Sequence, residues 1–99
     1  MTQLLKTSKD QMKVWRHHLH QHPETEFSVF NTAALVVQKL TEFGLVVHQG
    51  IGKIGIVGQL TKGTSTQAIG LRADMDALAI QEQNEFSHKS LNDGCMHAC

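Results

Sequence analysis

The chain has 99 residues, 40% of them hydrophobic and 18% charged, and its nine acidic residues balance its nine lysines and arginines. This size and composition are typical of one globular unit, leave no room for a second complete domain, and provide no basic stripe for binding nucleic acid or an anionic membrane. Residues 1–6 turn polar too soon for a signal peptide and no apolar run is long enough to span a membrane, so a cytoplasmic protein is expected.

The first predicted element is an amphipathic helix that ends near His22. Its apolar residues recur at helical spacing, and they are Leu5, Met12, Trp15 and Leu19. The helix begins either at Ser8, where Gln11 would complete a capping box, or earlier, near Thr2. Pro23 cannot continue the hydrogen-bond ladder and restricts the residue before it, so the chain leaves the helix abruptly there.

A second amphipathic helix is predicted over residues 29–43. Its apolar stripe consists of Phe30, Ala33, Val37 and Leu40. Ser28 is positioned to cap the first turn of this helix. Gly44 offers the left-handed conformation that commonly follows the last turn of a helix.

Three short strands are predicted after the second helix, at residues 45–48, 53–60 and 67–73, because these runs are β-rich and separated by glycines and polar residues. The polar turn at residues 62–66 is short enough to make an antiparallel hairpin of the second and third strands. Residues 68–71 have no polar side chain, as expected for a strand that is covered on both faces. The chain is therefore predicted to be α/β, with two helices followed by strands of a mixed sheet.

Two carboxylates, Asp74 and Asp76, directly follow the third predicted strand. Ligands of open α/β sheets bind beyond the carboxyl ends of the strands, so side chains at this position are well placed to bind a metal or to orient one of its ligands. The alternative is structural: Asp74 turns the chain and Asp76 is solvated. The spacing of the two residues leaves both interpretations open.

A second candidate is the C-terminal cluster of Cys95, His97 and Cys99, which holds three potential metal donors within five residues. Thiolate and imidazole are good ligands for zinc and neighbouring divalent metals. A zinc site needs four ligands, however, and no other group in the sequence is evidently paired with this cluster. A pair of free thiols beside a surface histidine is the alternative.

Four histidines, at positions 17, 18, 20 and 22, lie toward the end of the first predicted helix. His18 and His22 are one helical turn apart, which is a spacing that can hold a metal ion. The preferred interpretation is that His20 and His22 bond the last carbonyls of the helix and complement its dipole.

Together these segments resemble the amidohydrolase branch of the metallopeptidase superfamily, which includes carboxypeptidase G, aminoacylase, hippurate hydrolase and the auxin-conjugate hydrolases. The resemblance runs from about Trp15 to Cys99, and the order and spacing of its motifs make it specific. The motifs are Arg16-His17-His18-Leu19-His20-Gln21-His22-Pro23-Glu24, Thr32-Ala33-Ala34 with Lys39-Leu40 and Phe43-Gly44, Gly50-Ile51-Gly52, Gly70-Leu71-Arg72-Ala73-Asp74-Met75-Asp76-Ala77-Leu78, and Met96-His97-Ala98-Cys99.

In this family the last motif continues as Cys-Gly-His-Asp, and its cysteine binds a two-metal centre. The resemblance therefore implies that Cys99 is the first metal ligand, that Asp76 orients a metal-ligating histidine, and that His97 lies beside the site. It also implies hydrolysis of N-acyl amino acids by a water held between two divalent ions, for which manganese, zinc, cobalt and nickel are candidates. The glutamate that acts as general base in the family has no counterpart in this sequence.

The resemblance makes residues 1–99 the N-terminal segment of a catalytic domain, without the rest of that domain or the lid and dimerisation domain. We therefore expect the 99-residue polypeptide to be inactive alone and, because sheet edges and an apolar helix face are left uncovered, to be marginally stable or to self-associate. Ala79 departs from the family, which usually has proline there. Two other hypotheses are a non-catalytic truncated module that binds itself or a partner chain, and a small metal-binding protein that uses Cys95, His97 and Cys99.

Overall fold

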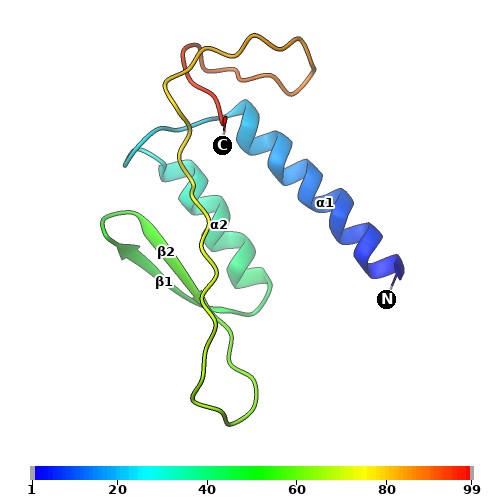
Figure 1. Ribbon diagram of the computed structural model, residues 1–99, viewed down its shortest axis with the longest axis vertical. Helices are drawn as coiled ribbons and strands as arrows, with labels where there is room; N and C mark the ends of the chain where they lie inside the picture. The colour runs from blue at the N-terminus through cyan, green and yellow to red at the C-terminus, as the bar shows by residue number, and fades with distance from the viewer. Residues whose placement is uncertain (1, 99) are drawn as a thin grey trace. The chain divides into compact units, whose positions relative to one another are not determined.

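The computed structural model describes residues 2–98 and contains two helices followed by a two-stranded sheet (Figure 1). In chain order the elements are α1 (Thr2–Gln21), α2 (Phe30–Glu42), β1 (Val46–Ile51) and β2 (Gly55–Gln59). The chain divides into two compact units: unit 1 combines the chain up to Glu26 with the chain from Asp76 on, and unit 2 is Phe27–Met75. The predicted α/β class, with helices preceding strands, is confirmed.

In unit 1, α1 starts at the earlier of its two predicted positions. Ser8 lies inside the helix and does not cap it. The C-terminal end agrees with the prediction, since the His22 N–H donates the last helical bond to the carbonyl of His18 at 3.2 Å and Pro23 follows. Neither helix described in residues 2–98 is long and apolar enough to cross a membrane.

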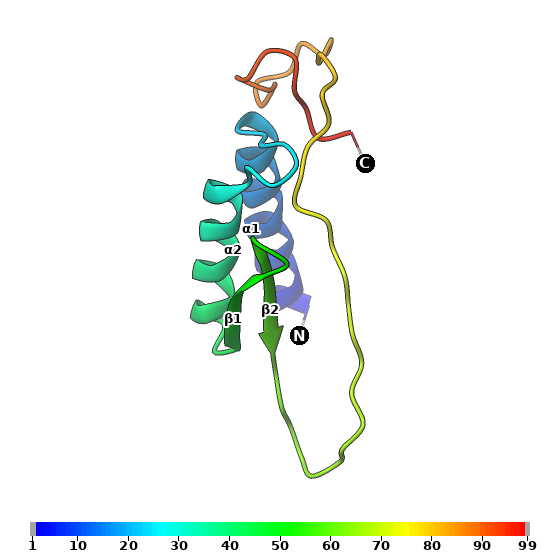
Figure 2. The ribbon, with the colours of Figure 1, turned by 90° about the vertical axis from the view of Figure 1, so that its left-hand side faces the viewer.

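The segment of residues 80–95 lies against the C-terminal end of α1, as Figures 1 and 2 show. Three hydrogen bonds with Gln21 and Pro23 hold it there: Leu91 N–H to the Gln21 carbonyl (2.9 Å), Gln21 Nε2 to the Ser87 carbonyl (3.1 Å) and Asn92 Nδ2 to the Pro23 carbonyl (3.2 Å). The segment has no regular secondary structure, so these bonds and the buried residues beneath it determine its path.

In unit 2, α2 begins without the predicted polar cap. Val29, and not Ser28, is the N-cap residue, and there is no side-chain cap hydrogen bond at this position. Val29 is only 1% exposed. Burial of an apolar side chain therefore determines where the chain enters this helix, a feature that the capping preference does not include.

The C-terminal end of α2 is terminated by Gly44, as predicted. Gly44 has a φ of +84°, its N–H donates to the Thr41 carbonyl, and the next N–H, of Leu45, donates to the Leu40 carbonyl. This pair of bonds is the Schellman motif, in which a left-handed glycine satisfies carbonyls that the helix leaves free.

β1 and β2 form an antiparallel hairpin that packs against α2 (Figure 2). The pairs are Val46↔Gln59, Val47↔Gly58, His48↔Val57 and Ile51↔Gly55, with an irregularity between His48 and Ile51. The backbone reverses at Gly52 and Lys53, both with positive φ. Lys53 holds its ammonium group 4.6 Å from the centre of the Phe27 ring, which is cation–π distance and helps to support a strained residue in the turn.

The third predicted strand, at residues 67–73, is not formed. The hairpin lies between β1 and β2 and not between the second and third predicted strands, so residues 2–98 contain no mixed sheet. Ile69 and Leu71 are 92% and 97% exposed and not covered on either face. The apolar run indicates a buried environment correctly, but a strand also needs a neighbour for its N–H and C=O groups, and the described residues provide none.

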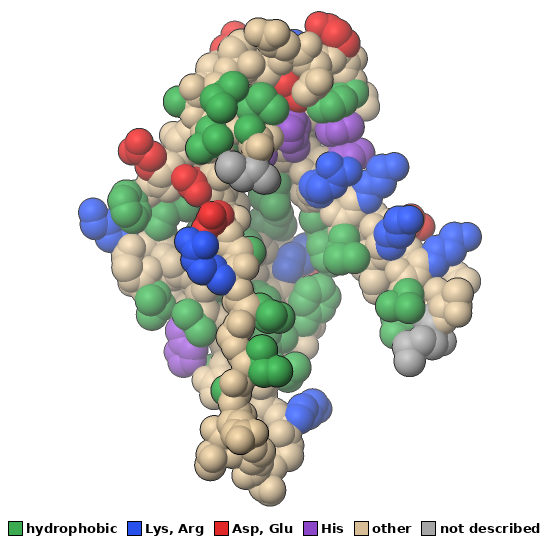
Figure 3. All heavy atoms as spheres, in the orientation of Figure 1, with side chains coloured by type: hydrophobic (Ala, Val, Ile, Leu, Met, Phe, Trp, Pro, Cys, Tyr) green, Lys and Arg blue, Asp and Glu red, His purple; other side chains and the backbone are tan. Residues whose placement is uncertain are grey.

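The buried positions are few in both units. In unit 1 they are Pro23, Ala77, Glu82 and Cys95, and in unit 2 they are Val29 and Thr32. Many large apolar side chains of the described residues are exposed, as the hydrophobic side chains of Figure 3 illustrate. Exposed apolar surface on this scale is typical of chains that contact further protein.

Candidate functional site

Two short backbone pairings in unit 1 arrange the candidate site. The Ala77 N–H donates to the Glu24 carbonyl at 2.7 Å. This bond connects the segment that begins at Asp76 to the loop that follows α1. Leu78 and Met96 exchange both of their backbone hydrogen bonds, at 2.9 and 3.0 Å. The C-terminal motif is thereby aligned antiparallel to the residues that follow Asp76.

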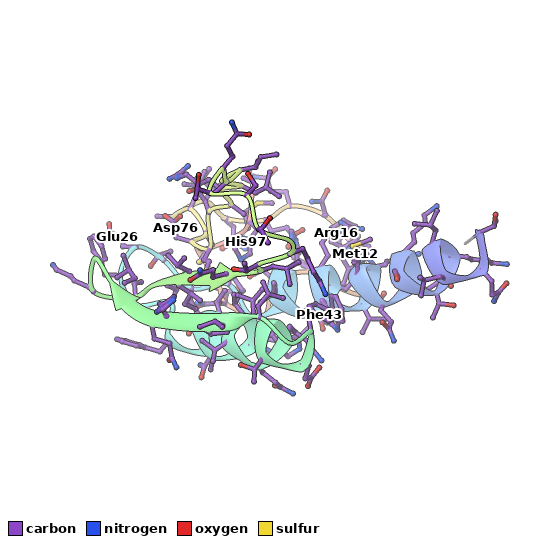
Figure 4. All side chains as sticks on the ribbon, turned by 90° about the horizontal axis from the view of Figure 1, so that it is seen from below. Met12, Arg16, Glu26, Phe43, Asp76 and His97 are labelled. Atoms are coloured by element: carbon purple, nitrogen blue, oxygen red, sulfur yellow. The ribbon has the colours of Figure 1, made fainter. Side chains whose placement is uncertain are left out.

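Asp76 and His97 flank these pairings and belong to the same unit (Figure 4). The Nε2 atom of His97 is buried and has no hydrogen-bond partner among the described residues. Burial lowers the pKa of His97 below 6.5, His20 lowers it further, and the nearby Asp76 carboxylate opposes both effects. The neutral ring therefore presents a buried nitrogen without a partner close to an exposed carboxylate.

Asp74 has a different setting from Asp76. It belongs to unit 2 and pairs with Arg72 at 2.7 Å between Nη2 and Oδ1, with both side chains well exposed. Exposed ion pairs of this kind contribute little to stability. The environment of Asp74 agrees with the solvated alternative.

The two cysteines cannot be treated alike. Cys95 is buried and reduced, and burial raises the pKa of its thiol, so the thiolate that binds metals is disfavoured. Cys99, the predicted first metal ligand, lies outside the described residues. Residues 2–98 hold no group of three or more potential ligand side chains, and the third donor of the predicted cluster of Cys95, His97 and Cys99 lies outside them, so that cluster stays a prediction.

Among the histidines near the end of α1, His20 is arranged differently from the prediction. The rings of His18 and His22 lie 4.8 Å apart, and no third ligand among the described side chains joins them. His20 does not cap the helix end as predicted: its Nε2 lies 2.9 Å from Glu82 Oε2. A buried carboxylate 62 residues away attracts this ring more strongly than the solvent-accessible carbonyls of the last turn.

Glu82 is a buried residue that the sequence analysis missed. It is 2% exposed, and its carboxylate accepts hydrogen bonds from His20 Nε2 (2.9 Å), Asn84 Nδ2 (3.0 Å) and the Ser90 N–H (2.6 Å). Burial alone would raise the pKa of Glu82, but the three hydrogen bonds outweigh it and lower the pKa to about 2. Glu82 therefore stays ionised and accepts only, and its three partners must donate.

No local pattern marks Glu82 in the sequence. Residues 81–85 read Gln-Glu-Gln-Asn-Glu and resemble an exposed polar loop. The signal that distinguishes this glutamate from its neighbours is its set of distant partners, and these become visible only in the folded chain.

An aromatic stack lies next to His20, the residue that donates to Glu82. His88 is sandwiched between His17, with ring centroids 3.6 Å apart, and Phe86, at 3.9 Å, and all three rings are nearly parallel. Figure 3 shows histidine side chains gathered on this part of unit 1. The stack connects α1 to the 80–95 segment through a second contact, independent of Glu82.

The stacked arrangement leads us to predict a lowered pKa for His17. Desolvation is the main effect that lowers the pKa of His17 below 6.5, and the neighbouring His88 and Arg16 add to it. We expect the NMR midpoint of His17 to lie below 6.5 and to move back toward that value in His88→Ala, which removes both the stacked ring and its charge. His48, on β1 in the other unit, is the internal reference, and an unchanged His17 midpoint in the variant would contradict the stacked arrangement.

Comparison with protein-family models gives no match. The chain is 54% identical over 84 residues to a hippurate hydrolase of Campylobacter jejuni, covering 85% of this chain and 22% of that protein. It is 41% identical over 91 residues to an N-acyl-L-amino acid amidohydrolase of Geobacillus stearothermophilus, covering 92% and 25%. Its fold matches the YXEP protein of Bacillus subtilis, described as a dinuclear metal binding peptidase from the M20 family, with a TM-score of 0.88 and 33% identity over 95% of this chain and 26% of that one.

The chain belongs to the amidohydrolase branch of the metallopeptidase superfamily. The resemblance inferred from its motifs is confirmed. The chain spans about a quarter of the length of the relatives that it matches.

A metallopeptidase needs a metal centre, and unit 1 fits part of one. The buried, unpartnered nitrogen of His97 beside Asp76 is suited to a polar group or ion at this place. The described residues do not complete a site, because they bring no three ligand side chains together. Residues 2–98 by themselves therefore carry an incomplete donor set.

Proposed function

We propose that this chain contributes the first metal ligand and its supporting residues to a hydrolase that removes acyl groups from N-acyl amino acids. The observation that carries the proposal is the double pairing in unit 1, which holds the segment after Asp76 beside Met96 and His97, two residues before Cys99 in the sequence. The substrate class follows from the hippurate hydrolase and the N-acyl-L-amino acid amidohydrolase among the relatives.

Cys99 has the role of metal ligand in this proposal, and Asp76 that of the carboxylate that orients a metal-ligating histidine and raises its basicity. Bound divalent ions, with manganese, zinc, cobalt and nickel as candidates, would supply an activated water and polarise the acyl carbonyl. His97 borders this place with a neutral ring. We assign it the role of shaping the site. Because its ring is neutral, His97 adds no positive charge beside the metal ions.

Glu82 is not the general base of the reaction. Its carboxylate is saturated by three donors, and its pKa of about 2 makes it a poor proton acceptor near neutral pH. The base is therefore expected from protein outside this chain, and so are the other metal ligands. The 99-residue polypeptide alone is expected to have no hydrolase activity.

A chimera tests the proposal. In it, the residues of this chain replace the segment of the Campylobacter jejuni hippurate hydrolase that aligns with them. We expect the chimera to hydrolyse hippurate in the presence of added metal, to within about tenfold of the native rate, and the isolated chain to show no hydrolysis above a metal blank. Inactivity of a folded chimera, or activity of the isolated chain, would contradict the proposal.

Two matched pairs of variants in the chimera separate the proposed site residues from their neighbours. Cys99→Ser is expected to lower kcat/KM at least about 100-fold and Asp76→Asn about 10- to 100-fold. Cys95→Ser and Asp74→Asn make the same chemical changes at a buried free thiol and at a surface ion pair, and are expected to stay within about threefold of the unmodified chimera. Equal losses within either pair would reject the assignment.

A further inference from the structure

The hydrogen-bond donors to the buried Glu82 come from separate parts of unit 1. His20 lies on α1, Asn84 is two residues away, and Ser90 lies eight residues further along the chain. The shortest bond is the one from the Ser90 backbone, at 2.6 Å. A charged acceptor makes stronger hydrogen bonds than a neutral one, so this carboxylate holds the backbone of Ser90 firmly to the end of α1.

Ser90 passes this constraint to the C-terminal motif. Its hydroxyl lies 2.8 Å from the Cys95 carbonyl and 3.1 Å from the Asn92 carbonyl, and it accepts the Asn92 N–H at 3.2 Å. The carbonyl of Cys95 is thus anchored one residue before Met96. The N–H and the carbonyl of Met96 are in turn both hydrogen-bonded to Leu78.

A second anchor acts on the same stretch. Gln81 accepts the Gly94 N–H at its side-chain oxygen, at 2.5 Å, and its amide nitrogen reaches the carbonyl of Glu82 at 3.3 Å. Gly94 has a φ of +79°, a conformation open to glycine, so the chain turns sharply there into the motif. The residues around Glu82 therefore hold both ends of the turn that precedes Cys95.

We propose that Glu82 is a positioning residue for the metal-ligand motif, acting through Ser90 to hold residues 95–98 in register with the segment after Asp76. Glu82 touches neither substrate nor metal in this role. It fixes the path of the chain one to two residues before Met96, and the Leu78–Met96 pair delivers the motif beside Asp76. The positioning of a metal ligand rests on the proposed function, whereas the effect of Glu82 on the motif can be measured without it.

Amide hydrogen exchange of the 99-residue chain tests the proposal directly. In Glu82→Gln an amide NH2 group replaces one acceptor oxygen. It opposes either the Ser90 N–H, which Oε1 accepts, or the His20 and Asn84 donors, which share Oε2, and in both cases the charge that strengthens the Ser90 bond is lost. We expect exchange at the Met96 and Leu78 amides to become at least about tenfold faster, while the amides of α1 and the Ala77–Glu24 bond change less than about threefold. Glu85→Gln is the matched control, since Glu85 is exposed, carries the same charge and lies three residues away; it is expected to leave Met96 unchanged.

Ser90→Ala keeps the experiment decisive if Glu82→Gln unfolds. This variant removes the hydroxyl bonds to Cys95 and Asn92 but retains the Ser90 N–H that Glu82 accepts. We expect faster exchange at Met96 with unaltered ring signals of His20. Unchanged Met96 exchange in Ser90→Ala, or a loss of protection that is uniform over unit 1 in Glu82→Gln, would overturn the positioning role and leave Glu82 a general structural residue.

The chimera with hippurate hydrolase supplies the functional arm. Glu82→Gln is expected to raise the cobalt concentration needed for half-maximal activity at least about tenfold, with activity recovered in excess cobalt, because a displaced ligand weakens binding without removing a donor. Activity that excess cobalt does not recover would overturn the link to the metal motif. An inactive parent chimera would reject the proposed function, and the exchange experiment would still decide the role of Glu82.

Discussion

The Tm of the 99-residue chain is expected to fall by at least several degrees between pH 4.5 and pH 2, and Glu82→Gln is expected to remove most of this fall. The pKa of Glu82 in the folded chain is lowered from its ordinary 4.5 to about 2. A carboxyl group with a depressed pKa contributes stability that is present above the unfolded value and is lost as the pH falls through the folded one. The unfolded chain therefore takes up the proton first, and acid favours unfolding over this interval.

Thermal melts at several pH values, followed by circular dichroism, provide the measurement. Above pH 4.5 the glutamine variant should melt below the unmodified chain, and the two curves should converge as pH 2 is approached. Glu42, whose pKa is lowered by its hydrogen bonds to Gln38 and Lys39, accounts for part of the dependence that remains in the variant. Parallel curves down to pH 2 would show that the Glu82 hydrogen bonds are absent in solution, and Glu85→Gln should retain the full dependence.

Gly55→Ala is expected to destabilise the β1–β2 hairpin by about 1–3 kcal/mol. Gly55 is the direct partner of Ile51 at the end of the hairpin, and a Cβ placed on it would overlap the Ile51 carbonyl oxygen. The obstructing atom belongs to the backbone and cannot rotate away. Relief therefore requires a shift of the strand pairing itself.

Gly70→Ala is the matched control for this substitution. An added Cβ on Gly70 meets nothing within 4 Å, and its φ is not in the left-handed region. Urea unfolding of this variant is expected to agree with the unmodified chain to within about 0.5 kcal/mol. If the two variants were equally stable, the tight pairing of Gly55 with Ile51 would be wrong.

Local sequence signals located the ends of the helices well. Pro23 cannot donate a backbone hydrogen bond, and Gly44 adopts a left-handed conformation at little cost, so both act within one or two turns of their own position. The start of α2 was less accurate, because burial of Val29 replaced the polar cap expected at Ser28. Burial depends on neighbours that a capping rule does not consider.

For the candidate site, too, some features could be predicted from the sequence and others required the structure. The motifs around Asp76 and Met96–Cys99 were chosen as candidates from the sequence, because chemistry restricts which residues bind and orient metals, and their metal roles stay predictions. The distinction between Asp74, paired with Arg72 on the surface of unit 2, and Asp76, near His97 in unit 1, required the structure. The two aspartates of one Asp-x-Asp motif therefore have different environments in the folded chain, although the sequence does not distinguish them.

By itself the sequence determined the α/β class, both helices and membership of the amidohydrolase branch, since each depends on short-range patterns or on ordered motifs. Only the tertiary structure decided that residues 67–73 lack a strand partner and that Glu82 is ionised and buried. Both features depend on contacts between distant residues: a strand exists only with a neighbour, and a buried carboxylate is stable only with donors around it. For Glu82 those donors are His20, Asn84 and Ser90, and folding alone brings them together.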